Sequence, residues 1–136
     1  MAALSSLGRY KDFGLLLARI GLGLSFIFLH GYPKLVGGVE TWKVVGSAMS
    51  NLGIDFFPAV WGFLAGFTEA VGGLFLLLGL FYRPACLLLA FTMLVAGMNH
   101  LAMGDGLMGA AHAFELLVVF VGLLFVGPGK YSVDKR

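Results

Sequence analysis

Four long apolar stretches, separated by short turns rich in polar residues, glycine and proline, dominate the pattern of positions along this chain. Each stretch is close to the ~20 residues that an α-helix needs to cross a hydrocarbon core about 30 Å thick. Breakers such as the Gly37-Gly38 pair and the run 127–129 mark where stretches end. The pattern therefore predicts four transmembrane helices in a single domain over residues 1–136, at about residues 13–31, 56–80, 84–102 and 110–126.

The segment 39–52, between the first two apolar stretches, has a different pattern. Its apolar residues recur every three or four positions, which is the spacing of one helix face, and most of its other positions are polar. The segment is too short to span a membrane, and a tryptophan such as Trp42 suits the headgroup layer. We expect an amphipathic helix that lies on the membrane surface between spans one and two.

Composition excludes a soluble fold. The chain is 60% hydrophobic and 12% charged, whereas a soluble domain carries about 25% charged residues. The surplus apolar surface must face lipid, so the bilayer is the first partner. A net charge of +2 gives no reason to expect a nucleic-acid partner. The single cysteine, Cys86, has no second cysteine to pair with, and we interpret it as a small core residue.

Lysine and arginine are distributed unevenly over the two sides of the predicted bundle. With both termini on one side, that side holds six of them and the other side holds two. The positive-inside bias places the richer side in the cytoplasm. We therefore predict a multi-pass protein with both termini cytoplasmic and the 39–52 helix on the outer face. The six are Arg9, Lys11, Arg83, Lys130, Lys135 and Arg136, and the two are Lys34 and Lys43.

Each ionisable residue inside a predicted span shares a helix face with small residues. Glu69 lies seven positions after Gly62 and four before Gly73. Membrane helices approach one another through such small faces, so we expect these ionisable side chains to point into an all-α four-helix bundle. The other faces combine Arg19 with Gly23, His100 with Gly97, and Glu115 with Ala111 and Gly122.

Arg19 and Glu69 form the first candidate for chemistry. A charge at the bilayer centre is penalised by about 2.5–3.5 kcal/mol on insertion scales, so each one is a functional candidate. Arg19 lies about 9 Å above the inner end of its span at 1.5 Å per residue, and Glu69 lies close to mid-membrane. We predict that they pair as a buried polar centre. The alternative is that the pair only fixes helix order.

A second group of ionisable residues gathers toward the outside, where we expect His30, His100, His112 and Glu115 to meet beneath the Trp42 helix. Glu115 is the strongest single candidate, because it lies about one turn below the interface with no cationic partner in its own helix.

Four interpretations of this group remain open. Two histidines could ligate haem iron axially, or histidines and a carboxylate could hold a divalent metal. Histidine and glutamate could instead bind the head of a lipid-soluble quinone and exchange protons with it. The fourth interpretation is that histidines at helix ends are merely solvated.

Three blocks of residues together resemble the DoxX family of small bacterial membrane proteins. The blocks are Arg19-x-x-Leu22-Gly23 with His30-Gly31-x-x-Lys34-Leu35, then Glu69-x-x-Gly72-Gly73 with Gly79 and Arg83, and finally Glu115 with Gly127-Pro128-Gly129-Lys130-Tyr131-Ser132-x-Asp134. The resemblance implies a four-helix membrane protein with a link to quinone-dependent redox chemistry. Related four-helix proteins include assembly factors and candidate carriers. His100 and His112 lie outside the blocks, which weakens the metal and haem interpretations; we predict no metal site.

The leading hypothesis is a redox accessory subunit of the bacterial inner (cytoplasmic) membrane, linked to a quinone-dependent oxidoreductase. Glu115, His112 and His30 would act on the head of a quinone-like amphipathic molecule, with haem as the less favoured cofactor. The residues lining the cofactor site would be Arg19, Glu69, His100 and Trp42. The chain has too little mass outside the membrane for a substrate domain, so we expect a redox partner subunit, and a small-residue face could form a homo-oligomer. The alternative function is a non-catalytic scaffold, assembly factor or small-solute carrier.

Overall fold

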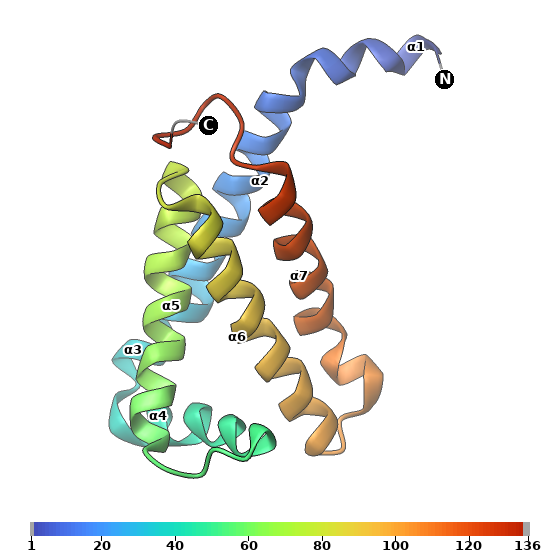
Figure 1. Ribbon diagram of the computed structural model, residues 1–136. Coiled ribbons are helices and arrows are strands. Elements are labelled where there is room, and N and C mark those ends of the chain that lie inside the picture. The colour runs from blue at the N-terminus through green and yellow to red at the C-terminus, as the bar shows by residue number, and fades with distance from the viewer. Residues whose placement is uncertain (1, 135–136) are drawn as a thin grey trace.

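The computed structural model describes residues 2–134, and the regular elements in that part of the chain are all helices. Four helical runs are long and apolar enough to cross a membrane (Figure 1). This confirms the all-α bundle of four spans. The runs are residues 3–36, α5 (Pro58–Leu78), α6 (Tyr82–Ala102) and α7 (Gly106–Val126).

The first run is longer than expected because the helix continues beyond its apolar part. It comprises α1 (Ala2–Ser5), the 3-10 turn η1 (Ser6–Tyr10), α2 (Lys11–Ser25), the π-helical η2 (Phe26–Gly31) and α3 (Tyr32–Val36). The prediction used hydropathy, which identifies only the residues that can lie in the hydrocarbon core. Helical backbone hydrogen bonds continue on both sides of those residues. Helices α6 and α7 likewise begin two and four residues before the predicted spans, whereas α5 is two residues shorter at each end.

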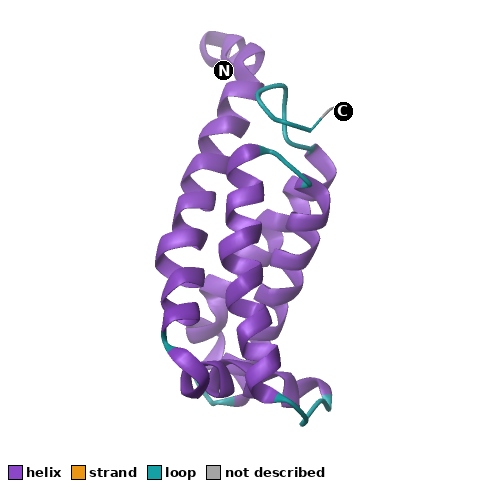
Figure 2. Cartoon of the chain, turned by 90° about the vertical axis from the view of Figure 1, so that its left-hand side faces the viewer, coloured by secondary structure: helices purple, strands orange, loops and turns teal. Residues whose placement is uncertain are grey.

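Both termini lie at the same end of the bundle, here called the terminal end (Figure 1; Figure 2). At the opposite end lies the expected amphipathic segment, which is formed by α4 (Gly38–Gly46) and the 3-10 helix η3 (Ser47–Leu52). Helices α5 and α6 converge at the terminal end and separate toward α4 (Figure 1). The η3 segment bridges that separation, because the Asn51 amide donates to the Asn99 side-chain oxygen on α6 at 3.2 Å. Helices α5 and α6, together with the α4–η3 segment, therefore bound a wedge that narrows toward the terminal end.

The small face of α5 carries the closest helix packing, as predicted. A Cβ atom at Gly73 would lie 2.9 Å from the Gly23 carbonyl oxygen on α2, and one at Gly66 would lie 3.1 Å from Cβ of Lys34 on α3. At Gly62 an added Cβ would collide with the Trp42 backbone on α4. Successive segments of the first run and α4 thus lie directly against α5, which requires glycine at the contacts.

The segment after α7 folds back onto the α5–α6 turn and closes the terminal end. Gly79 adopts a left-handed conformation with φ of 68°, and its carbonyl oxygen accepts from the Asp134 N–H at 2.8 Å. The Asp134 carboxylate in turn accepts from the N–H groups of Phe81 and Tyr82, at 3.0 and 2.8 Å. Those groups open α6 and have no partner within the helix. Asp134 therefore caps α6 from a distant part of the chain.

Candidate functional site

Arg19 does not pair with Glu69, so that prediction is wrong. The Arg19 residue is 1% exposed, and its guanidinium donates to four backbone carbonyl oxygens. Two belong to Leu76 and Leu77, both at 3.0 Å, and two to Pro128 and Tyr131, at 3.0 and 2.7 Å. The last carbonyls of a helix lack partners and carry the negative end of its dipole, so the end of α5 attracts this cation without a carboxylate. Arg19 joins α2, α5 and the C-terminal segment.

Glu69 pairs instead with Lys34, which reaches it from α3. The Lys34 ammonium forms an ion pair and hydrogen bond with Glu69 Oε1. The Glu69 residue is 0% exposed, whereas 30% of the Lys34 side chain is exposed. Oε2 of Glu69 is buried and has no hydrogen-bond partner among the described residues. The sequence reasoning missed Lys34 as a site residue. Gly66 could have pointed to it, because Gly66 and Glu69 share a face of α5, and the segment that packs on Gly66 carries Lys34.

The Lys34–Glu69 pair lies at the wall of a cavity of about 600 Å³, here called the main cavity. The cavity occupies the wedge between α4–η3, α5 and α6. Most of its lining is apolar, and the polar side chains come from α3, α5 and α6. Its lining includes Val45, Met49, Leu64, Thr68, Phe91, Thr92, Met93, Asn99 and His100.

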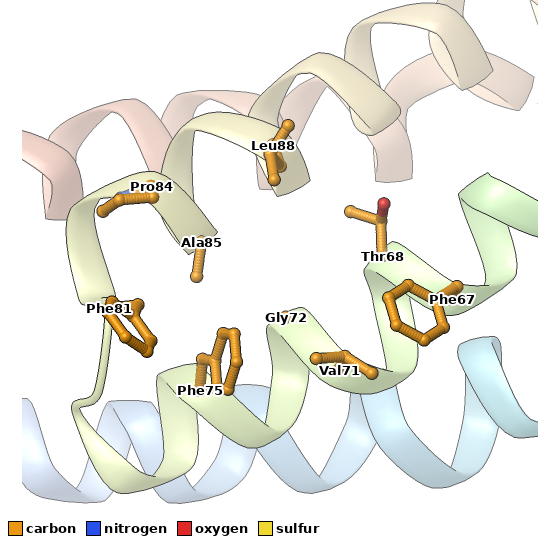
Figure 3. Close-up of a pocket in the computed structure, with 9 residues that line it drawn as sticks. All are labelled: Phe67, Thr68, Val71, Gly72, Phe75, Phe81, Pro84, Ala85 and Leu88. Carbon is orange, nitrogen blue, oxygen red and sulfur yellow. The ribbon is translucent and has the colours of Figure 1, made fainter.

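A second, smaller cavity of about 260 Å³, here called the apolar annex, lies between α5 and α6 toward the terminal end. Thr68 and Leu88 line both cavities, and the two side chains extend from α5 and α6 into the same gap (Figure 3). Gly72 and Ala85 leave room between the helices, and phenylalanine side chains flank it (Figure 3). The two cavities therefore adjoin, with the charged pair in the larger one and almost purely apolar walls in the smaller one.

The predicted cluster of three histidines and Glu115 does not form. His30 stacks on His112 with ring centroids 5.6 Å apart and an interplanar angle of 27°. His100 belongs elsewhere, because its Nδ1 lies 2.8 Å from Asp105 Oδ2 and it lines the main cavity. Stacked imidazoles face each other, whereas axial haem ligands point their nitrogens at an iron between them. In residues 2–134, no group of three or more His, Cys, Asp or Glu side chains is placed to hold a metal ion.

Glu115 lies on the outside of the bundle, so the expectation that it points inward is wrong. The buried residues of α7 are Ala110, Ala113 and Phe120. A helix turns 100° per residue, which places Glu115 about 200° around from Ala113. On the same face of α7, a Cβ atom added at Gly122 would meet nothing within 4 Å. Glu115 is exposed and makes no ion pair or side-chain hydrogen bond within the described part of the chain.

Trp42 supports the site without lining it. Its indole Nε1 donates to the Lys34 carbonyl oxygen at 2.9 Å, and its ring packs edge to face against Phe63 on α5 at 5.0 Å. Both contacts hold α3 and α4 against α5. Of the seven residues proposed from sequence, only Glu69 and His100 line the main cavity.

Comparison with known proteins connects this architecture to a described family. The DoxX family model matches residues 14–126. The inner membrane protein YphA of Escherichia coli (strain K12) is 31% identical over 142 residues, covering 94% of this chain and 97% of YphA. The inner membrane protein YqjF of the same organism is 31% identical over 130 residues, covering 93% of this chain and 94% of YqjF. No solved structure matches the chain significantly.

Proposed function

This chain is an integral membrane protein that belongs to the DoxX family, and we propose that it holds a quinone-like amphipathic molecule in the main cavity as an accessory to redox chemistry. The observation that carries the proposal is the buried carboxylate of Glu69, paired with Lys34 on one oxygen only and placed at the wall of an apolar cavity. Small-molecule sites are typically cavities of about 300–1,000 Å³ with few polar groups that orient the ligand.

The shape of the two cavities suits a molecule with a polar head and an apolar tail. The head would lie against Lys34 and Glu69, and the tail would extend past Thr68 and Leu88 into the apolar annex. Lys34 and Glu69 thereby replace His30, His112 and Glu115 as the head contacts. A carboxylate and an ammonium beside a quinone head could also exchange protons with it.

The redox role is what the family resemblance implies, and in this proposal the electron donor would be a partner subunit. We further propose the bacterial inner membrane, since both similar E. coli proteins are named inner membrane proteins. The orientation prediction is supported by the positive residues of the elements at the terminal end, where the positive-inside bias favours the cytoplasm. They are Arg9 in η1, Lys11 at the start of α2, Arg83 in the first turn of α6 and Lys130 after α7. Lys135 and Arg136, which contributed to the same prediction, lie outside the described residues.

The test measures the molecule that the protein retains. Protein purified in lipid nanodiscs is extracted with organic solvent, and quinone is quantified by mass spectrometry and by a reduced-minus-oxidised ultraviolet difference spectrum. We expect wild type and Glu115→Gln to retain the molecule, counted as quinone plus its reduced quinol form. The Ala65→Phe/Ala96→Phe variant fills the main cavity from α5 and α6. Its retained amount should be lower than that of wild type by a factor of about ten or more. Equal retention by wild type and the filled variant would reject the main cavity as the site.

A non-catalytic scaffold is the second candidate function, and Glu115 is the observation that favours it. Its exposed carboxylate lies near the middle of α7, where lipid contact is costly and a helix of another protein, or of a second copy, could supply a donor. This function predicts that Glu115→Leu abolishes co-purification of a membrane partner while quinone retention stays unchanged.

A further inference from the structure

We infer that the main cavity selects amphipathic molecules whose head donates a hydrogen bond, such as a phenol, an alcohol or the reduced quinol form of a quinone, over molecules whose head only accepts, such as the oxidised quinone. This inference rests on the proposed function, because it requires the cavity to hold a ligand. It starts from Glu69 Oε2, which is buried and has no hydrogen-bond partner in residues 2–134. A buried acceptor without a partner is costly, the more so when it is charged. An unpartnered carboxylate oxygen can only be satisfied by a donor.

The protein groups nearest to the cavity do not supply that donor. The Lys34 ammonium is held at the other oxygen, Oε1. The Thr92 hydroxyl donates to the Leu88 carbonyl oxygen at 2.9 Å, and the Asn99 amide donates to the Met103 sulfur at 3.3 Å. His100 is engaged with Asp105. Neither these groups nor the Thr68 hydroxyl, which also lines the cavity, forms a hydrogen bond with Oε2. A donor on a molecule inside the cavity would therefore satisfy this oxygen.

The surroundings of Oε2 also restrict the rest of that molecule. A carboxylate, phosphate or sulfate head would place a second negative charge beside Glu69, and an ether or ester would place lone pairs against lone pairs. A hydroxyl head donates one hydrogen bond and adds no charge. The adjoining apolar annex, with its phenylalanine side chains, gives an alkyl or aryl tail a place to lie. The ligand class is a neutral, hydroxyl-headed amphipathic molecule.

A matched pair of ligands tests this class: a dodecylphenol and its methyl ether, which differ only in the donor hydrogen. Binding is followed in phosphatidylcholine nanodiscs by quenching of tryptophan fluorescence, since Trp61 lines the main cavity, with the Ala65→Phe/Ala96→Phe protein as the blank for partition into lipid. We expect the Kd of wild type for the phenol to be lower than its Kd for the ether by a factor of about ten or more. The reason is that a hydrogen bond to a charged group is stronger than one between neutral groups. Glu69→Gln should lower that ratio to near one, and Glu115→Gln should keep it.

The outcomes separate this inference from the proposed function. If phenol and ether bind wild type equally and the filled variant binds neither, the cavity holds amphipathic molecules but donor selection is wrong, and an internal water satisfies Glu69. If neither ligand binds wild type more than the filled variant, both the inference and the proposed function fail. The comparison of the two ligands on wild type decides the question even if Glu69→Gln does not fold.

Discussion

The Lys34 ammonium on α3 engages one carboxylate oxygen of Glu69 on α5, and the other oxygen remains without a partner in the described chain. This asymmetry leaves one buried carboxylate oxygen without a donor on a residue that lines the main cavity. It arises because Gly66 lets α3 approach α5 closely enough for a lysine on one helix to reach a carboxylate on the other. The pair thereby connects helix packing to ligand binding.

Breaking this pair should destabilise the fold unequally from its two sides. Lys34→Met leaves a fully buried carboxylate uncompensated, whereas Glu69→Gln leaves a lysine that can move toward the interface, since 30% of its side chain is exposed. Removing one partner of a buried pair costs about 3–5 kcal/mol, so we expect Lys34→Met to lose about that much and Glu69→Gln to lose less. Thermal unfolding in detergent measures both. Equal losses from the two variants would mean that Glu69 is not buried as an anion.

Arg19→Lys should not behave as a conservative change. A single ammonium cannot donate to four carbonyl oxygens spread over α5 and the C-terminal segment. We expect a loss of about 2–4 kcal/mol and faster proteolysis within residues 127–134. Arg9→Lys is the matched control, because Arg9 is exposed and donates only to the nearby Ser6 carbonyl oxygen. Unchanged proteolysis in Arg19→Lys would show that Arg19 does not hold this segment.

Two glycine substitutions should separate packing from helix propensity. Gly62→Ala places a methyl group into the Trp42 backbone, so α4 must move away from α5. Gly122→Ala meets nothing within 4 Å and should stabilise α7 by up to about 1 kcal/mol. We expect Gly62→Ala to lower the unfolding temperature and to change ligand retention, because α4–η3 forms one wall of the main cavity. If Gly62→Ala and Gly122→Ala both unfold at the wild-type temperature, the close contact between Gly62 and the Trp42 backbone does not contribute to stability.

Glu115→Leu should leave the bundle and its ligand unchanged. The side chain is exposed on α7 and lines neither cavity, so removing its charge should make α7 more compatible with lipid. Thermal unfolding and quinone content of the purified protein measure the two effects. A large loss of quinone with an intact fold would return Glu115 to the ligand site and contradict the placement found here.

The sequence by itself determined the elements of this protein. Apolar length and the breakers around residues 37–38 and 127–129 predicted four spans, and the three-to-four spacing in residues 39–52 predicted the amphipathic segment. The spacing of Gly62, Gly66 and Gly73 also predicted which face of α5 its neighbours cover. These features depend on local periodicity and on the thickness of the bilayer, which act on each helix separately.

Only the tertiary structure decided which groups meet. Helical periodicity gives the face of a residue on its own helix, but it does not say which neighbour covers that face. Arg19 donates to backbone carbonyl oxygens and does not pair with Glu69, because the end of α5 and the C-terminal segment place those oxygens within hydrogen-bond distance. Glu115 turned to the outside, because α7 packs through Ala113 and Phe120. Long, flexible side chains and the rotation of whole helices are settled by packing between segments distant in sequence, so the cavity and its Lys34–Glu69 pair emerged only when the helices were assembled.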